Sequence, residues 1–510
     1  MIILASRKDA ESPEYNHEEH DTDLRIATLK ALVIYIIFAI LAPLPRKEER
    51  LVMTENAPPV KLGETIQTTI TGYGHDGEGV GRYEDFTLFI NGALRGEEIR
   101  VRVTEVRRTF GRAEILQVLQ PSPERQKSPC PIYERCGGCQ LLHLSYEAQL
   151  ELKRQRVIDA LTRLAGLHDV PVKETVGMQD PWHYRNKVQY PIGVSGRDLI
   201  VGCYERHTHQ IVPTTSCLIQ QEVNNRLMLA VRDLAQETGL TAYDEPTGRG
   251  FLRHVLIKNA HHTKQAMVVL VTNGRDFPGA DALGQALAAR VPELTGLVQN
   301  INMQKGNTVL GPETRVLWGE NAIIDEVGDL RFRISATSFF QVNPMQTEVL
   351  YNIAVASAGL TGRETVVDAY CGVGSLTLFL ARRAHHVYGV EVVEGAIEDA
   401  GENAKFNGIT NVSFLVGRTE KVLPKLAAIG IHFDVAVLDP PRAGCDPKVL
   451  ETIAKVGAER IVYVSCNPST LARDLKELIS LGYAVEDVQP VDMFPHTYHV
   501  ECVARVERKG

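Results

Sequence analysis

A cysteine directly after a predicted strand is the first residue of this chain that could do covalent chemistry. Residues 459–465 (Glu-Arg-Ile-Val-Tyr-Val-Ser) are typical of a buried strand, and Cys466-Asn467-Pro468 follows as a tight loop. In open α/β sheets the loops at the carboxyl ends of parallel strands hold the reactive groups, so Cys466 is a candidate nucleophile. The alternative is a structural cysteine, because cysteine is one of the most commonly buried residue types.

Two carboxylates occupy comparable places in the sequence. Asp439 follows a predicted strand and opens the loop Asp-Pro-Pro-Arg at 439–442, whose prolines stiffen it and remove backbone donors. Glu501 begins the last predicted strand, after a loop that holds His496 and His499. A place at the carboxyl edge of the sheet favours a functional Asp439 over a simple turn cap. The alternative for Glu501 is that it belongs to a surface loop and has no role. The spacing of the two histidines is not diagnostic of a metal site.

A strand, a glycine turn and a helix follow one another at residues 365–381. Asp368 lies near the end of the strand, and Gly372 and Gly374 lie in the turn, where they let the backbone approach a ligand beside unpaired helix N–H groups. The next strand ends in Glu391, the usual place for a carboxylate that binds a ribose. The turn lacks the third glycine of a dinucleotide site. The pattern therefore favours S-adenosylmethionine over NAD.

Three cysteines lie close together on a loop that contains Pro and Gly, at Cys130, Cys136 and Cys139. Three thiolates so near one another indicate a soft-metal site, whose fourth ligand must come from elsewhere in the chain. Cys217 is a better candidate for that ligand than Cys203, because Cys203 lies inside a predicted strand. Spacing alone does not separate zinc from an iron–sulfur cluster.

Alternating short strands fill the region from residue 59 to residue 120. Five such strands separated by turns predict a small closed barrel. A Gly-rich segment at 72–81 and five arginines between 100 and 112 fit an oligonucleotide-binding barrel, although a solvated basic edge is an equal alternative. The region resembles the TRAM domain, an RNA-binding, OB-like barrel, which we assign to residues 56–120. The predicted strands are 64–71, 79–83, 86–90, 98–103 and 111–118.

Length, composition, charge and cysteine count limit the number of domains and the class of protein. A chain of 510 residues is expected to hold two to four domains, and 44% hydrophobic with 23% charged residues is an ordinary globular composition. The formal net charge of -8 argues against a general nucleic-acid binder and leaves room for a local basic face. Nine clustered cysteines do not suggest a disulfide scaffold, so we expect a reducing, cytoplasmic location.

The first 55 residues differ from the rest. An acidic opening leads to an apolar run at 31–44, which is shorter than the ~20 residues that span a bilayer. We expect an atypical extension without stable membrane association, and a natural start at Met53, because codons for Lys47-Glu48-Glu49 can encode a purine-rich ribosome-binding sequence.

Two further domains are expected after the barrel. Residues 121–330 mix strands with Gly- and Pro-rich turns and predict a central α+β domain that holds the cysteine loop. It includes helices at 145–165 and 280–290, the first with an exposed basic patch at Lys153, Arg154 and Arg156. Residues 331–510 predict a Rossmann-like, α/β methyltransferase domain.

Five motifs in order resemble the RNA uracil-5 methyltransferases, and within them the branch with a TRAM domain and a [4Fe-4S] cluster that acts on 23S ribosomal RNA. The motifs are Gln341 in Ser-Phe-Phe-Gln-Val-Asn, the Asp368 turn, the Asp439 loop, Ser-Cys466-Asn-Pro and the segment 496–501. The likeness runs from about residue 59 to the end.

The resemblance implies roles. Cys466 adds to C6 of uracil so that C5 takes the methyl group, and Glu501 removes the C5 proton. It also implies an unstacked target base in the site, a barrel that holds flanking RNA, and no protein partner. The implied cofactor contacts are Gln341, Tyr370, Glu391 and Asp439, beside Asp368, Gly372 and Gly374, and the implied cluster ligands are Cys130, Cys136, Cys139 and Cys217.

Three other functions remain open at this point. A uridine in the T-loop of tRNA is a near alternative substrate, since the motifs are common to the family. Radical S-adenosylmethionine chemistry would need three cysteines that leave one iron open, against which Cys217 and Cys466 both argue. The third is a non-catalytic RNA-binding protein.

Overall fold

The computed structural model describes residues 58–510. The expected extension at 1–55 and the expected start at Met53 lie outside the described residues. No helix within residues 58–510 is both long enough and apolar enough to cross a membrane.

The first described domain is the expected barrel of five strands. The sheet closes in the order β1-β2-β3-β5-β4, with β3 and β5 parallel and the other neighbours antiparallel. Alternate residues point inward, so Ile70, Leu88, Ile99 and Val101 are fully buried in its core. The barrel prediction is confirmed. Its strands are β1 (Thr65–Tyr73), β2 (Gly79–Tyr83), β3 (Phe86–Ile90), β4 (Glu98–Val106) and β5 (Phe110–Gln120).

A seven-stranded mixed sheet follows, in the order β12-β11-β10-β9-β6-β7-β8. Strands β9 and β10 are buried along their whole length, because α3 (Glu222–Glu237) and α4 (Ala280–Arg290) cover one face and the hairpin β13–β14 packs on the other. The strands are β6 (Lys187–Ser195), β7 (Asp198–Tyr204), β8 (Ile211–Pro213), β9 (Leu252–Asn259), β10 (Ala266–Thr272), β11 (Leu294–Ile301), β12 (Glu313–Gly319), β13 (Ala322–Val327) and β14 (Leu330–Ser335).

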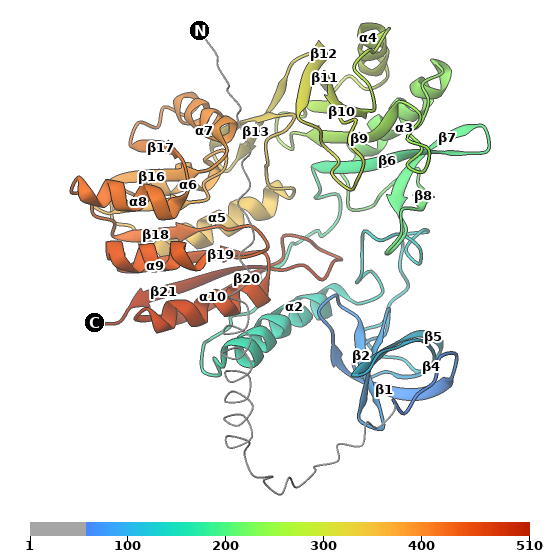
Figure 1. Ribbon diagram of the computed structural model, residues 1–510, viewed down its shortest axis with the longest axis horizontal. Coiled ribbons are helices and arrows are strands. Elements are labelled where there is room, and N and C mark those ends of the chain that lie inside the picture. The colour runs from blue at the N-terminus through green and yellow to red at the C-terminus, as the bar shows by residue number, and fades with distance from the viewer. Residues whose placement is uncertain (1–57) are drawn as a thin grey trace, which may run out of the picture. The chain divides into compact units, whose positions relative to one another are not determined.

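The carboxyl-terminal sheet has the order β17-β16-β15-β18-β19-β21-β20, with its first five strands parallel (Figure 1). From β15 the strand order runs to one edge of the sheet through β16 and β17, and to the other edge through β18 and β19. Doubly wound sheets bind ligands at such a switch point, which here lies between β15 and β18. The strands are β15 (Thr365–Ala369), β16 (His386–Glu391), β17 (Val412–Val416), β18 (Val435–Leu438), β19 (Arg460–Ser465), β20 (Tyr483–Val491) and β21 (Glu501–Arg508).

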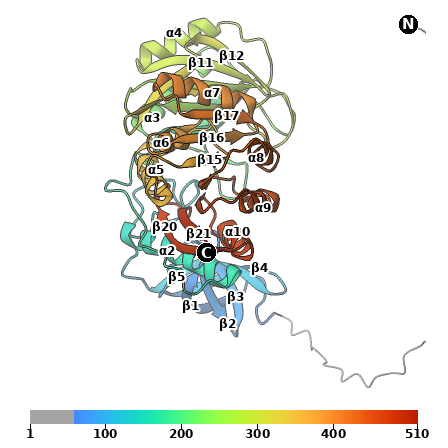
Figure 2. The same cartoon turned by 90° about the vertical axis from the view of Figure 1, so that its left-hand side faces the viewer.

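Helices cover both faces of this sheet, with α5 and α6 on one side and α8, α9 and α10 on the other (Figure 2). The strands alternate accordingly: Val435 and Val437 pack in the core with α5 and α6, whereas Ala436 and Leu438 pack with α9 and α10. The helices are α5 (Pro344–Ala358), α6 (Ser375–Ala381), α7 (Glu394–Phe406), α8 (Thr419–Ala428), α9 (Pro447–Val456) and α10 (Pro468–Ser480).

Helix α2 (Tyr146–Ala160), extended by the π-helical turn η1 (Leu161–Ala165), packs against α10 and β20 of the carboxyl-terminal half. The expectation of an exposed basic patch on it is wrong. Lys153 is 0% exposed and forms an ion pair with the equally buried Asp492. Arg156 donates to the carbonyl oxygens of Tyr498 and His75. The helical periodicity of the sequence marks a polar face, but it cannot show that residues more than 300 positions away cover that face.

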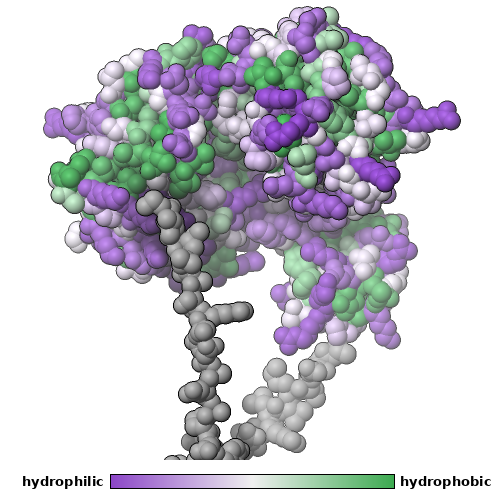
Figure 3. Space-filling view, turned by 45° about the horizontal axis from the view of Figure 1, so that its top comes forward, coloured by the Kyte–Doolittle hydropathy of each residue, from purple (hydrophilic) through white to green (hydrophobic). Residues whose placement is uncertain are grey.

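One face of the described residues carries both hydrophilic and hydrophobic side chains (Figure 3). On the face in Figure 3, hydrophilic and hydrophobic residues are interspersed, as an ordinary globular composition predicts.

Candidate active site

Strand register brings the candidate nucleophile and the candidate base together. Strands β19 and β21 pair antiparallel, and the last pair joins Ser465 to Cys502. Cys466 directly follows Ser465 and Glu501 directly precedes Cys502, so both residues lie at the same end of this strand pair, and the charge of Glu501 helps to raise the pKa of the Cys466 thiol. Glu501 is only 5% exposed, so the surface-loop alternative for this residue is wrong.

Two loops at the carboxyl edge of the sheet are bonded to each other. Asn467 caps helix α10 by accepting from the Ser469 amide at 3.1 Å, and its side-chain amide donates to the carbonyl of Arg442 at 3.1 Å. Thr470 donates to the same carbonyl at 3.3 Å. These bonds fix the loop that carries Cys466 against the loop that carries Asp439.

The site is a group of buried acids. Burial and, to a smaller extent, the nearby Asp439 raise the pKa of Glu501 to about 8, while Arg442 lowers it. Burial also raises the pKa of Asp439 to about 7. The pKa of the Cys466 thiol rises to about 11 through burial and the two carboxylates, while Arg442 lowers it. Strongly perturbed acids gathered in one place are typical of catalytic sites.

The glycine turn lies beside these acids. Asp368 is buried in β15, accepts from the Thr377 hydroxyl at 2.5 Å, and has its pKa raised to about 7, mainly by burial. Gly372 and Gly374 both have positive φ, at 53° and 78°. A side chain at Gly374 would meet Phe414 at 3.0 Å, so this close packing requires glycine.

The other expected cofactor contacts, Glu391, Tyr370 and Gln341, lie on three different segments of the chain. The Glu391 carboxylate accepts from the amides of Val392 and Val393, at 2.7 and 3.0 Å, which holds it at the end of β16. Tyr370 has a positive φ of 70°, unusual for a residue with a side chain, and its ring packs on the α9 side of the sheet. Gln341 lies in the loop before α5, where its carbonyl accepts from Asn186 at 3.2 Å.

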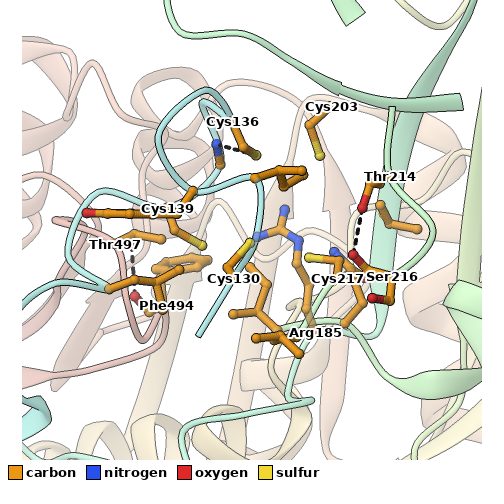
Figure 4. A pocket seen from close by; sticks show the side chains of 18 of the residues that line it. Cys130, Cys136, Cys139, Arg185, Cys203, Thr214, Ser216, Cys217, Phe494 and Thr497 are labelled. Atoms are coloured by element: carbon orange, nitrogen blue, oxygen red, sulfur yellow. Dashed lines mark hydrogen bonds between the residues drawn. The ribbon is translucent and has the colours of Figure 1, made fainter. Parts of the chain in front are cut away.

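All four expected cysteine ligands line one cavity of about 360 Å3 (Figure 4). The loop of Cys130, Cys136 and Cys139 forms one side, and Cys217 approaches from another segment with Arg185 between (Figure 4). Among residues 58–510, no three His, Cys, Asp or Glu side chains converge closely enough to hold one metal ion.

A fifth thiol lines the same cavity. Cys203, in β7, hydrogen-bonds Cys136, which is the main cause of a pKa for Cys136 lowered to about 6. The cavity therefore does not separate Cys217 from Cys203 as the fourth ligand. Arg442 and His499 also line it, so the thiol cavity borders the loops of the acid group.

Sequence reasoning missed one side chain at the site. The hydroxyl of Tyr351, on α5, bonds the hydroxyl of Ser375 at the start of α6, at 2.7 Å. Burial and the charges of Asp439, Asp368 and Glu501 raise its pKa. In the sequence Tyr351 is one more apolar position of a helix, so nothing there marks it.

Two family models match the chain. One is described as the TRAM domain and matches residues 59–116, and the other as tRNA (Uracil-5-)-methyltransferase and matches residues 320–509. The first match coincides with the barrel, and the second covers the β13–β14 hairpin and the carboxyl-terminal sheet.

Whole-chain relatives agree with these matches. An uncharacterized RNA methyltransferase of Halalkalibacterium halodurans is 47% identical over 458 residues, which is 90% of this chain and 100% of the relative. One from Bacillus cereus is 47% identical over 451 residues, 88% of this chain and 98% of the relative. Among solved structures, the tRNA (uracil-54, C5)-methyltransferase of Pyrococcus abyssi, in complex with S-adenosyl-L-homocysteine, is 27% identical with a TM-score of 0.68, covering 86% of this chain and 100% of its own.

Proposed function

Because this chain belongs to the RNA uracil-5 methyltransferases that carry a TRAM domain, we propose that it methylates a uridine of 23S rRNA, with Cys466 as nucleophile and Glu501 as base. The enzyme is an RNA (uracil-5)-methyltransferase and S-adenosylmethionine is its methyl donor. The single observation that supports the residue assignment is the pairing of Ser465 with Cys502, which leaves Cys466 and Glu501 at the same end of strands β19 and β21.

The proposed reaction balances with these groups. The Cys466 thiolate forms a bond to C6, and the electrons of the C5–C6 double bond move to the O4 enolate. C5 would then form a bond to the methyl carbon of S-adenosylmethionine as the bond from that carbon to sulfur breaks. The electrons of the broken bond would stay on sulfur, which leaves neutral S-adenosylhomocysteine. The Glu501 carboxylate takes the C5 proton, the double bond re-forms, and the bond from sulfur to C6 breaks. Cys466 is regenerated as a thiolate.

The surroundings of Cys466 favour the protonated thiol in the empty site and the thiolate in the loaded site. Its raised pKa keeps the free thiol protonated near neutral pH, which protects it between turnovers. A sulfonium beside C5 adds positive charge to a pocket of carboxylates and so favours the thiolate. Arg442 acts in the same direction on Cys466 and Glu501.

The donor would be held around the glycine turn. Glu391 offers its second carboxylate oxygen to the ribose hydroxyls, and the close packing at Gly374 keeps the turn open to the ligand. Asp368 and Asp439 would face its positive charge, with Gln341 and Tyr370 completing the pocket. Both aspartates have raised pKa values, so a cation bound beside them would stabilise their ionised forms.

A [4Fe-4S] cluster is the group we propose for the thiol cavity, with Cys130, Cys136, Cys139 and Cys217 as ligands. Tetrahedral zinc holds sulfur atoms ~2.3 Å from one ion, whereas thiols around a wide cavity fit a larger group. The 360 Å3 volume and the all-thiol donor set agree with a cluster. It would supply structure, joining two segments far apart in the sequence.

The choice of 23S rRNA rests on the resemblance to the cluster-bearing branch of the family, which the thiol cavity supports. A tRNA uridine is the second candidate. It is favoured by the structural likeness to the Pyrococcus abyssi enzyme, whose name specifies uracil 54 of tRNA.

One trapping experiment tests both points. The protein is purified anaerobically, mixed with S-adenosylmethionine and total RNA containing 5-fluorouridine, and resolved on a denaturing gel. Fluorine replaces the proton that Glu501 removes, so the methylated adduct stays on Cys466 and its RNA can be sequenced.

We expect a trapped 23S fragment and no adduct with Cys466→Ala. Cys445→Ala, a buried thiol outside the proposed chemistry, is the matched control and should still trap RNA. Trapped tRNA would transfer the activity to the second candidate, and adducts that survive Cys466→Ala would refute the nucleophile.

A further inference from the structure

The loop that leads into the proposed base comprises residues 492–500, which join β20 to β21, and we call it the base loop. Strand pairing sets Glu501 opposite Val491, so the loop begins and ends beside the base. Within residues 58–510, neither a hydrogen bond nor an ion pair holds the Glu501 carboxylate. Burial and the charges of Asp439 and Arg442 set its pKa, with no contribution from a hydrogen bond. The conformation of the base loop, together with β21, therefore determines where this carboxylate lies.

One face of helix α2 carries polar side chains toward the base loop. At intervals of three, four and three residues the helix presents Tyr146, Gln149, Lys153 and Arg156, a spacing that places them on one face, and we call them the α2 stripe. Gln149 and Lys153 are fully buried, although glutamine and lysine usually face solvent. Their burial is explained by the groups that they bind.

Two members of the stripe hold the start of the base loop. The Tyr146 hydroxyl donates to the Asp492 carboxylate at 3.0 Å. Lys153 forms its ion pair with the same carboxylate and donates to the carbonyl oxygen of Phe494 at 3.0 Å. The Phe494 amide in turn donates to Asp492 at 3.2 Å. These bonds fix the turn by which the chain leaves β20.

The other two members hold the middle and the end of the loop. The side-chain oxygen of Gln149 accepts from the His496 amide at 3.0 Å. Arg156 donates to the carbonyl oxygen of Tyr498 and, at 2.9 Å, to that of His75 in the barrel. Residues 492, 494, 496 and 498 are therefore each bonded to the stripe, and the last of them lies three residues before the base.

We propose that the α2 stripe, with Gln149 and Lys153 at its centre, positions Glu501 for removal of the C5 proton. A general base must lie within hydrogen-bond reach of the proton that it takes, and the stripe acts on that geometry through the base loop. The inference rests on the proposed function in taking Glu501 as the base. Cys466 lies on another segment, so loosening the stripe should slow proton removal more than methyl transfer.

Two isotopes separate these two steps. Total RNA carrying 5-tritiated uridine is incubated with an excess of the full chain and with S-adenosylmethionine whose methyl group carries radiocarbon. Radiocarbon bound to RNA measures methyl transfer, including the covalent adduct, and tritium released into water measures loss of the C5 proton. The ratio of the two rates reports on the base. Loss of folded protein lowers both rates and leaves the ratio unchanged.

Two variants loosen the stripe. Gln149→Leu removes the bond to His496. The double variant Lys153→Met with Asp492→Leu replaces the ion pair by apolar side chains, because removing one member alone would leave a buried charge. Each should slow tritium release about 10- to 100-fold relative to methyl transfer, as displacement of a reacting group does. Tyr146→Phe, which removes one hydroxyl, gives the same reading with a smaller change if a buried variant fails to fold.

Gln155→Leu is the matched control, because Gln155 lies on α2 outside the stripe and bonds Asp159 of the same helix at 2.8 Å. It should keep the wild-type ratio, and Glu501→Gln should lower the ratio most. An unchanged ratio in the stripe variants, beside a lowered one in Glu501→Gln, would overturn this inference and leave the base assignment intact. An unchanged ratio in Glu501→Gln would refute the base assignment, and this inference with it.

Discussion

At the scale of single residues, the distinctive property of this protein is a group of buried acids with a thiol. Cys466, Glu501, Asp439 and Asp368 all have raised pKa values, and burial is the largest cause for each. Burial thus favours the neutral form of each group, and a cation bound beside them would favour the charged form.

Removing the base should divide the reaction into two parts. With Glu501→Gln the thiol can still add and C5 can still take the methyl group, but the C5 proton stays. We expect kcat to fall about 10^2- to 10^4-fold and a covalent adduct to accumulate with ordinary uridine RNA. Denaturing electrophoresis with radiolabelled RNA measures it, and Glu507→Gln on the same strand is the control. Loss of kcat without adduct would assign Glu501 an earlier role.

The buried acids should make the fold less stable as pH rises. Asp439 has an ordinary pKa of 3.8 and a folded pKa of about 7, so its contribution is fully present below pH 4 and is lost as pH rises through 7. Asp439→Asn removes this loss. Calorimetry at pH 5 and pH 8 should show a smaller fall in Tm for the variant, with a stabilisation on the order of a few kcal/mol at pH 8. Equal falls for both proteins would contradict the burial argument.

At the scale of elements, the turn between β15 and α6 is constrained at its glycines. Both of its glycines have positive φ, but their surroundings differ. A Cβ at Gly374 would lie 3.0 Å from Ala400 and from Phe414, whereas one at Gly372 would meet no described atom within 4 Å.

The two glycines therefore form a matched pair. Gly372→Ala should cost only the left-handed backbone penalty, about 1–2 kcal/mol. Gly374→Ala adds overpacking of about 1–3 kcal/mol and should push the turn into the cofactor pocket. Thermal unfolding measures the stability, and calorimetric titration with S-adenosylmethionine should show a larger loss of affinity for Gly374→Ala. Equal losses of stability and of affinity in the two variants would mean that backbone strain alone causes them.

At the scale of the whole described chain, segments distant in sequence are joined around the thiol cavity and the catalytic edge. The buried pair of Lys153 with Asp492 ties α2 to the loop before β21, and the thiol cavity joins the cysteine loop to the central sheet and to Arg442. The catalytic edge is thus assembled from three parts of the chain.

The fourth ligand of the proposed cluster can be decided by comparing two serine variants. If Cys217 is the ligand, Cys217→Ser should lose iron and the visible absorption of the cluster on anaerobic purification, while Cys203→Ser keeps both. Iron and sulfide analysis measures the outcome. The reverse pattern would name Cys203, and tightly bound zinc in place of iron would refute the cluster.

The sequence by itself determined the local structures and the chemical identity of the site. Period-two alternation specified the barrel, and turn glycines and strand-end acids specified a methyltransferase sheet, because these signals depend only on neighbouring residues. Cys466, Glu501 and Asp439 were expected at the edge where the structure brings them together.

Only the tertiary structure decided what distant segments do to one another. It buried Lys153 against Asp492, placed Tyr351 beside the acids, and brought Cys203 into the thiol cavity that a strand position had seemed to exclude. The assigned domain boundaries and the functional roles of the residues stay predictions. Burial and pairing arise from contacts across hundreds of residues, and no local pattern encodes them.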